Sequence, residues 1–250
     1  MSSLQYNEIF DARKLHYIIN NWDSIQFKDS EIKDNNEKWQ LLTILNNYLN
    51  NSKFYKDNQY IIKVNYKQNH KDIGRFFAKC SLSLQSLPRE IRHTISKEYY
   101  YDIDIVNAHP EILYQYCIKH KLEVPNLKNY IDNINEILTN IMNKGNLDKD
   151  EAKKLNLTVN NGGDIKNSLD CLFLYKYKDE ITYIHDYVCN QKENEEYLKI
   201  WTTNAKKKNG YKIKGSTVNI LLTNIENIIL TTMINYLTVK KMIKKMIKKM

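Results

Sequence analysis

Apolar residues recur along most of the chain at the three- and four-residue spacing of amphipathic helices. Before residue 60 this spacing occurs in LHYIINNW (15–22) and EKWQLLTILNNYL (37–49), on either side of a charged segment. YIIKVNY (60–66) is instead rich in β-branched and aromatic residues and is predicted to be a short strand. The pattern predicts that residues 1–73 form a mostly helical N-terminal region.

Further along, KEYYYDIDIV (97–106) is predicted to be a strand that turns at NAHP into a helix, with Pro110 tolerated in its first turn. Helical spacing continues over 126–144 and over 148–161, where Gly162-Gly163 ends the helix. Two more helices are expected over 168–188 and 216–237, flanking a polar, basic stretch (192–214). The expected class is α+β, predominantly helical.

The net charge of +9 is unevenly distributed along the chain. Residues 201–250 hold eleven lysines and one acid, Glu226, so the first 200 residues are close to neutral. No window has eighteen unbroken apolar residues, and the segment MSSLQYNEIFDARK lacks the apolar block of a secretory signal. We therefore expect a soluble, intracellular protein that does not enter a membrane. The four cysteines lack the spacing of a zinc site or a disulfide framework.

The composition draws attention to the rarer residue types. Asn, Lys, Ile and Tyr are abundant, whereas the chain has four Arg, six Gly and three Pro, as expected from a gene rich in A and T. Three of the arginines, Arg75, Arg89 and Arg92, fall within eighteen residues. Arginine binds phosphate in a bidentate geometry that lysine cannot reproduce, so these arginines are candidates for nucleic-acid contact, with surface ion pairs as the alternative.

Four segments occur in an order that suits nucleotidyl transfer. GRFFAKCSLSLQSLP (74–88) combines Gly-Arg with Leu-Gln and a turn proline, and DIVNAHPEIL (104–113) places Asp104 between a strand and a helix. Lys149 and Lys153 lie one helical turn apart and precede Asn161-Gly162. KGSTVNILLTNIENIIL (214–230) opens a helix with a small-residue turn.

In this order and spacing, residues 74 to about 237 resemble the family A DNA polymerases. In that family, Gly-Arg and Leu-Gln-x-(Ile/Leu)-Pro precede motif A, motif B reads Arg-x3-Lys-x7-Tyr-Gly, and a Gln-Gly-Thr turn leads to the helix before motif C. The resemblance implies an incomplete polymerase palm with a helical fingers subdomain over 74–239. Residues 1–73 would then be a reduced thumb-like region, and 240–250 a low-complexity Lys/Met/Ile tail.

The resemblance also implies roles for individual residues on the metal and nucleic-acid side. Asp104 would be the motif A carboxylate that binds catalytic Mg²⁺. Asp102 lies two residues earlier on the same strand face and could share the metal, although a solvated edge residue is the alternative. Arg75, Gln85 and Arg92 would contact the primer-template.

A second group of residues would bind the incoming nucleotide. Lys149 and Lys153 would hold the triphosphate, with Lys153 also counted as catalytic, unless the two lysines are only a solvated helix face. His109 occupies the place of the motif A Glu that lies against the sugar, and Asn161-Gly162 occupies the place of the motif B Tyr-Gly. The implied partners are nucleoside triphosphates and a DNA primer-template, with Mg²⁺ as the cofactor.

The sequence departs from the family at several of these positions. Asn161 replaces the motif B tyrosine, Leu157 replaces an aromatic residue, and Lys149 replaces an arginine. After residue 237 the chain offers only KKMIKKMIKKM, without the His-Asp of motif C that completes a two-metal site. His185-Asp186 in YIHDYV resembles motif C but lies on the wrong side of the small-residue turn. Whether a second chain supplies motif C is left open.

These observations leave three hypotheses. The chain is a degenerate or incomplete polymerase-like nucleotidyltransferase, impaired by the lack of motif C; or a non-catalytic nucleic-acid-binding protein; or a helical protein without a nucleic-acid role. The tail could form a basic amphipathic helix or be a simple-sequence expansion. The composition suggests a virus or mobile element, which would place the protein in the cytoplasm or nucleus of its host.

Overall fold

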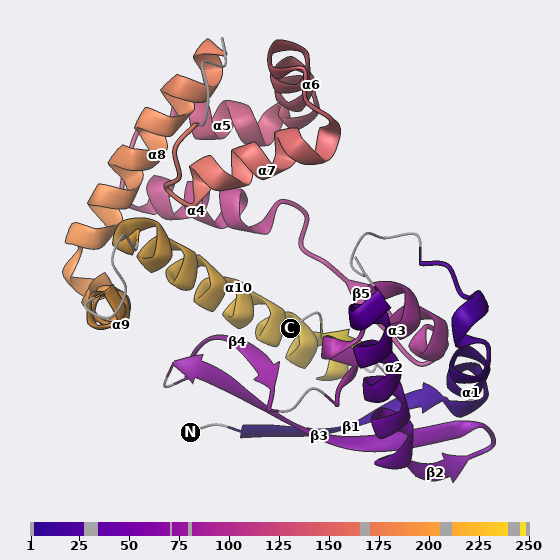
Figure 1. The fold of residues 1–250 in the computed structure, drawn as a ribbon. Coiled ribbons are helices and arrows are strands. Elements are labelled where there is room, and N and C mark those ends of the chain that lie inside the picture. Colours follow the sequence, from indigo (N-terminus) through magenta and orange to yellow (C-terminus); the bar gives the residue numbers. More distant parts are fainter. Residues whose placement is uncertain are drawn as a thin grey trace. The chain divides into compact units, whose positions relative to one another are not determined.

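The computed structural model describes residues 3–27, 35–70, 72–79, 82–165, 171–205, 212–239 and 246–248. The chain divides into two compact units (Figure 1): unit 1 comprises Met1–Asp104 with Leu230–Met250, and unit 2 comprises Ile105–Ile229. The α+β, predominantly helical class is confirmed. The division falls after Asp104, so the region expected to be continuous over 74–239 contributes to both units.

Unit 1 contains an antiparallel sheet of β1 (Ser3–Asp11), β2 (Lys53–Lys56), β3 (Gln59–His70) and β4 (Ile73–Ala78). The long strand β3 is its centre, because β1 pairs along one edge while β2 and β4 pair with opposite ends of the other edge. Alternate residues of β3 face inward, where Ile62, Val64 and Tyr66 are buried.

Three helices supply the other side of the unit 1 core: α1 (Ala12–Asn20), α2 (Asn35–Asn50) and α3 (Arg89–Ser96). Leu15, Leu45, Tyr48 and Ile95 from these helices pack in one cluster with the inward side chains of β3. Short 3₁₀ turns, η1 (Trp22–Ser24) and η2 (Leu84–Ser86), precede α2 and α3 along the chain.

The prediction that residues 1–73 are mostly helical is wrong. α1 and α2 are present where the spacing predicts them, but β1, β2 and β3 occupy much of this region. β1 lacks a clear apolar alternation because the inward position between Tyr6 and Phe10 is the charged residue Glu8.

The strand predicted over 97–106 is limited to β5 (Tyr101–Ile103), which pairs in parallel with β6 (Met246–Lys248). β6 contradicts the helical alternative for this part of the tail. The rest of the 240–250 repeat lies outside the described residues.

Unit 2 is built from α4 (Ala108–Lys119), α5 (Pro125–Asp132), α6 (Ile134–Gly145), α7 (Lys149–Asn160), α8 (Leu172–Asn190), η3 (Lys192–Asn194), α9 (Glu195–Ala205) and the first part of α10 (Ile213–Val239). Their apolar faces form one core, which includes Leu127, Ile141, Leu174 and Ile184. The helix expected over 126–144 breaks at Asn133, and the polar, basic stretch over 192–214 contains the helix α9, which was not predicted.

Among the described residues, α10 is long and apolar enough to cross a membrane when judged by length and composition. In unit 2, however, its residues Val218, Leu221 and Leu222 are buried in the core cluster with side chains of the other helices. This packing is typical of a core helix in a protein surrounded by water.

Candidate functional site

Helix α7, which carries the two predicted triphosphate-binding lysines, begins with a capping box. The Asp148 carboxylate accepts hydrogen bonds from the backbone N–H groups of Asp150 (2.9 Å) and Glu151 (2.8 Å), and the Glu151 carboxylate accepts one from the Asp148 N–H at 2.9 Å. Two of the three acids near the lysines are thus engaged with the helix N-terminus, which fixes where α7 starts.

Lys149, Lys153 and Leu157 follow one another at four-residue intervals on the solvent-exposed side of α7. Lys153 lies 3.8 Å from Asp150, a long and exposed pairing that holds the ammonium group only weakly. The opposite side of the helix is buried through Ala152 and Val159. As their spacing predicts, the two lysines share one accessible face.

The end of α7 is set by glycine. Gly162 has φ +73°, a left-handed conformation that other residues adopt only with strain, and the Gly163 N–H donates to the Thr158 carbonyl at 2.7 Å. A Cβ added at Gly162 would lie 3.2 Å from Nδ1 of His185. The predicted Gly162-Gly163 stop is therefore confirmed, and the turn is packed closely against α8.

The first turn of α10 packs on the same turn. A Cβ added at Gly215 would lie 2.1 Å from the carbonyl oxygen of Asn161, so only glycine permits this approach. One turn further along α10, the Asn219 amide donates to Oδ1 of Asn161 at 3.1 Å. Two of the four sequence segments, Asn161-Gly162 and the small-residue turn, are thus in direct contact.

Lysines gather around the loop that follows Gly162. The Asp164 carboxylate binds Lys178 at 3.0 Å and Lys212 at 3.2 Å, and these two ammonium groups lower the pKa of Asp164. Lys212 also donates to the Gly162 carbonyl at 3.1 Å. Asp164 and Lys212 are exposed and Lys178 is partly exposed, so their pairing adds little stability. The two lysines make the surface next to the α7 turn basic.

The His-Asp pair in YIHDYV does not form a motif C-like site. His185 is 2% exposed within α8, and burial lowers its pKa to about 4. Asp186 is partly exposed and forms an ion pair with Lys214. Consecutive helical residues point in different directions, so the imidazole lies in the core while the carboxylate reaches the surface.

His109 lies in the first turn of α4, and its Nε2 is 3.3 Å from Oε2 of Glu226 on α10. The Glu226 side chain is 8% exposed. The neighbouring residues Ala108 and Ile225 line a mainly apolar cavity of about 410 Å³ between α4 and α10. Sequence reasoning missed Glu226, because a single acid in an apolar helix carries no signal without its partner.

In unit 1 the structure shows hydrogen bonds of Gln85 that the sequence did not predict. Its amide oxygen accepts from the Ala78 N–H at 2.8 Å, and its amide nitrogen donates to the Phe76 carbonyl at 3.0 Å. Both ends of this side chain therefore bind the backbone of β4, so Gln85 links η2 to the sheet.

The two arginines expected to contact nucleic acid differ in setting. Nη1 of Arg92 donates weakly to the carbonyls of Leu84 (3.5 Å) and Leu87 (3.4 Å), which places this guanidinium against the η2 turn. Arg75 lies on β4 and is partly exposed. The Arg92 guanidinium thus contacts the backbone of the turn, and Arg75 belongs to the sheet.

The candidate Mg²⁺ ligands show no preformed cage. Asp104 follows β5 and is exposed, and the position of the Asp102 side chain lies outside the description. In the described parts of the chain, no group of three or more His, Cys, Asp or Glu side chains could hold a metal ion. The described side chains therefore do not by themselves fit the two-metal site that the resemblance implies.

A buried carboxylate that the sequence did not reveal organises unit 1. Glu8 accepts hydrogen bonds from the hydroxyls of Tyr48 (3.1 Å) and Tyr66, and from the Leu84 N–H at 2.7 Å. Burial raises the pKa of Glu8, and these three donors oppose that effect. Because the donors come from α2, β3 and η2, this carboxylate fixes the turn that carries Gln85.

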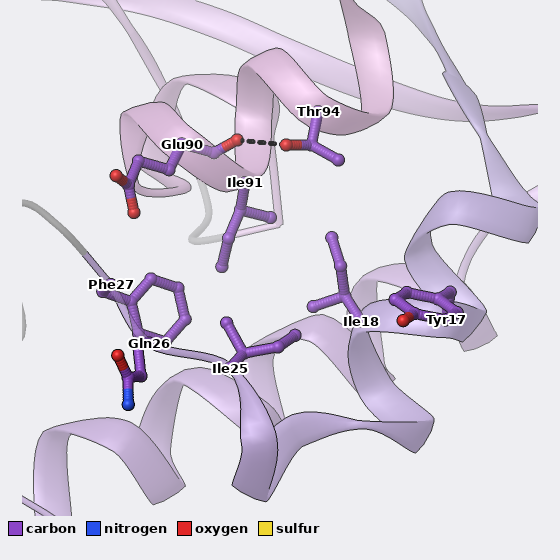
Figure 2. Close-up of a pocket in the computed structure, with 8 residues that line it drawn as sticks. All are labelled: Tyr17, Ile18, Ile25, Gln26, Phe27, Glu90, Ile91 and Thr94. Atoms are coloured by element: carbon purple, nitrogen blue, oxygen red, sulfur yellow. Dashed lines mark hydrogen bonds between the residues drawn. The ribbon is translucent and has the colours of Figure 1, made fainter.

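A second cavity, of about 480 Å³, lies between α1, the segment after η1, and α3. Figure 2 shows apolar side chains around it, with the carboxylate of Glu90 at its edge. None of the site residues predicted from the sequence lines this cavity. Its lining gives no sign of phosphate or metal chemistry.

Comparison with known proteins gives one informative similarity. Over 192 residues, 72% of the chain, the sequence is 32% identical to "Putative helicase V13" of the Sputnik virophage. The chain spans about a quarter (24%) of the length of that relative. No family model matches the chain, and no solved structure matches it. The chain is therefore related to part of a virophage protein, in keeping with the viral or mobile-element origin expected from its composition.

Proposed function

We propose that the chain is a nucleotidyltransferase-like protein, related to family A DNA polymerases, that binds nucleoside triphosphate on α7. The observation that carries the proposal is the exposed line of Lys149 and Lys153 leading to Asn161-Gly162, with Gly215 packed on that turn. Two ammonium groups one helical turn apart can hold neighbouring phosphates as point charges. The name of the virophage relative, a helicase, is compatible with a role related to nucleic acid but does not bear on nucleotidyl transfer.

The relative's name does not itself give this chain a helicase function. The glycine-rich phosphate loop of such motors reads G-x-x-x-x-G-K-[ST], and no glycine in these 250 residues is followed by lysine. Phosphate binding by this chain must therefore use other groups, and the α7 lysines are the best placed among the described residues. Asp104 is proposed as a Mg²⁺ ligand only together with carboxylates that the described residues do not supply.

The test is binding of a fluorescent deoxynucleoside triphosphate to the full chain. Replacing Lys149 and Lys153 together by Ala is expected to weaken binding at least about tenfold, because two charge-assisted contacts are lost. The matched control replaces Lys144 and Lys176, two exposed lysines on α6 and α8, by Ala. Equal binding by both double variants and the wild type would overturn the proposal.

A non-catalytic role in nucleic-acid binding is the second candidate, because the described residues form no metal cage. Primer extension with Mg²⁺ separates the two candidates. The incomplete cage predicts triphosphate binding without measurable extension. Extension by the wild type that disappears in Asp104→Ala would instead show that the chain is an active polymerase, and the non-catalytic candidate would be rejected.

A further inference from the structure

The sheet of unit 1 has two faces of opposite character. Ile62, Val64 and Tyr66 of β3 are buried in the core, whereas the alternate residues Lys63, Asn65 and Lys67 are exposed. We call the exposed side the outer face. It consists of the side chains that share the orientation of these three residues on all four strands.

Strand register identifies the other members of the outer face. In β1, Asn7 lies opposite Lys63 and Gln5 opposite Asn65, and the Gln5 amide donates to Oδ1 of Asn65 at 2.7 Å. In β4, Phe77 lies opposite Lys67 and is 41% exposed. The face carries six cationic side chains, contributed by β2, β3, β4 and the residue after β4: Lys53, Lys56, Lys63, Lys67, Arg75 and Lys79.

No described acid of these four strands is exposed on the outer face. The two acids of β1 are buried, Glu8 in the core and Asp11 as the N-cap of α1. Asp57 and Asp72 lie in the turns at the ends of β3. A concentrated positive surface is thus present in a part of the chain whose overall charge is close to neutral, so the basic C-terminal lysines are not its source.

We propose that the outer face binds a single strand of nucleic acid. Its cations suit a phosphate backbone, its amides can pair with base edges, and the exposed Phe77 ring offers a surface on which a base can stack. Lys63 and Lys67 are about 13 Å apart along β3, so the face is long enough for several nucleotides. A duplex is a poorer fit, because its base faces are already stacked and would leave Phe77 without a partner.

This proposal stands apart from triphosphate binding on α7, because it uses a different unit and different residues. The test measures binding of the full chain to a fluorescent single strand of twelve deoxythymidine nucleotides. Lys63→Glu with Lys67→Glu is expected to weaken binding about tenfold or more, and to reduce the slope of log affinity against log salt by about 1.4, or 0.7 for each lost phosphate contact. Phe77→Ala is expected to weaken binding at least about fivefold without changing that slope.

The matched control is Lys144→Glu with Lys176→Glu, which changes the net charge equally on exposed helices of unit 2. The control should bind the strand as the wild type does, and all variants should keep the wild-type urea midpoint because the altered side chains are exposed. Equal losses in the two double variants, or a duplex bound as tightly as the single strand, would overturn the proposal. Comparing the affinity for a twelve-nucleotide uridine strand with that for the deoxythymidine strand shows whether the face prefers RNA or DNA.

Discussion

Gly215 in the first turn of α10 lies so close to Asn161 that an added Cβ would be 2.1 Å from the Asn161 carbonyl oxygen. In an exposed helix, replacing Gly by Ala stabilises the fold by about 1 kcal/mol. Here Gly215→Ala is expected to destabilise the protein by about 1–3 kcal/mol, because backbone must move to remove the clash. Urea denaturation of the full chain measures the change.

Ser216→Ala serves as the control for this substitution. Ser216 is the next residue of the same turn and is only partly buried, so its replacement should change the free energy of unfolding by less than about 0.5 kcal/mol. A Gly215→Ala variant as stable as the wild type would show that the α7 and α10 turns are not in close contact.

Buried His185 makes the stability of unit 2 depend on pH. Its pKa is lowered to about 4, so the folded protein resists protonation, whereas the unfolded chain takes up a proton near pH 6.5. The contribution of His185 to the free energy of unfolding is at its full value above pH 6.5 and is lost as the pH falls toward 4. The difference of about 2.5 units corresponds to about 3 kcal/mol.

The comparison that isolates His185 uses His185→Phe, which keeps an aromatic ring but cannot be protonated. Between pH 7 and pH 4 the wild type should lose about 3 kcal/mol more unfolding free energy than this variant. Parallel pH profiles for the two proteins would show that His185 is accessible to protons in the folded state.

Glu8 gives unit 1 the opposite pH dependence of stability. Burial raises its pKa, so the folded state binds a proton at a higher pH than the unfolded chain does. The resulting stability is complete below about pH 4.5 and is lost as the pH rises through the raised pKa. Relative to Glu8→Gln, which cannot titrate, the wild type should become more stable as the pH is lowered from 7 to 4.5.

Urea denaturation at several pH values measures this difference. Glu8→Gln keeps one acceptor oxygen, and the Tyr48 and Tyr66 hydroxyls can accept from its NH₂ group, so both proteins should fold. A constant difference in unfolding free energy across this pH range would contradict the raised pKa.

The sequence predicted α7 well because its signals are local. Asp148 and Glu151 form a capping box within four residues, and Gly162 ends the helix through its own left-handed backbone. The shared face of Lys149 and Lys153 follows from helical spacing alone. None of these features depends on a distant part of the chain.

The features that could not be predicted depend on distant partners. β1 places Glu8 inward, which is stable only because Tyr48, Tyr66 and Leu84 supply donors from other elements. Likewise, nothing near Glu226 in the sequence identifies His109 as its partner. Contacts of this kind arise from the tertiary fold, so the spacing of apolar residues in the sequence does not predict them.

The backbone role of Gln85 can be tested directly. Its amide accepts from Ala78 and donates to Phe76, so Gln85→Glu keeps the acceptor but places a carboxylate oxygen against the Phe76 carbonyl. This substitution is expected to cost about 1–3 kcal/mol of unfolding free energy, because one bond is replaced by repulsion between two acceptors. Thr94→Ala is the control, because the Thr94 hydroxyl donates to the Glu90 carbonyl one turn earlier in its own helix. If Gln85→Glu were as stable as Thr94→Ala but lost affinity for a primer-template, Gln85 would have the nucleic-acid role first expected of it and not the structural one.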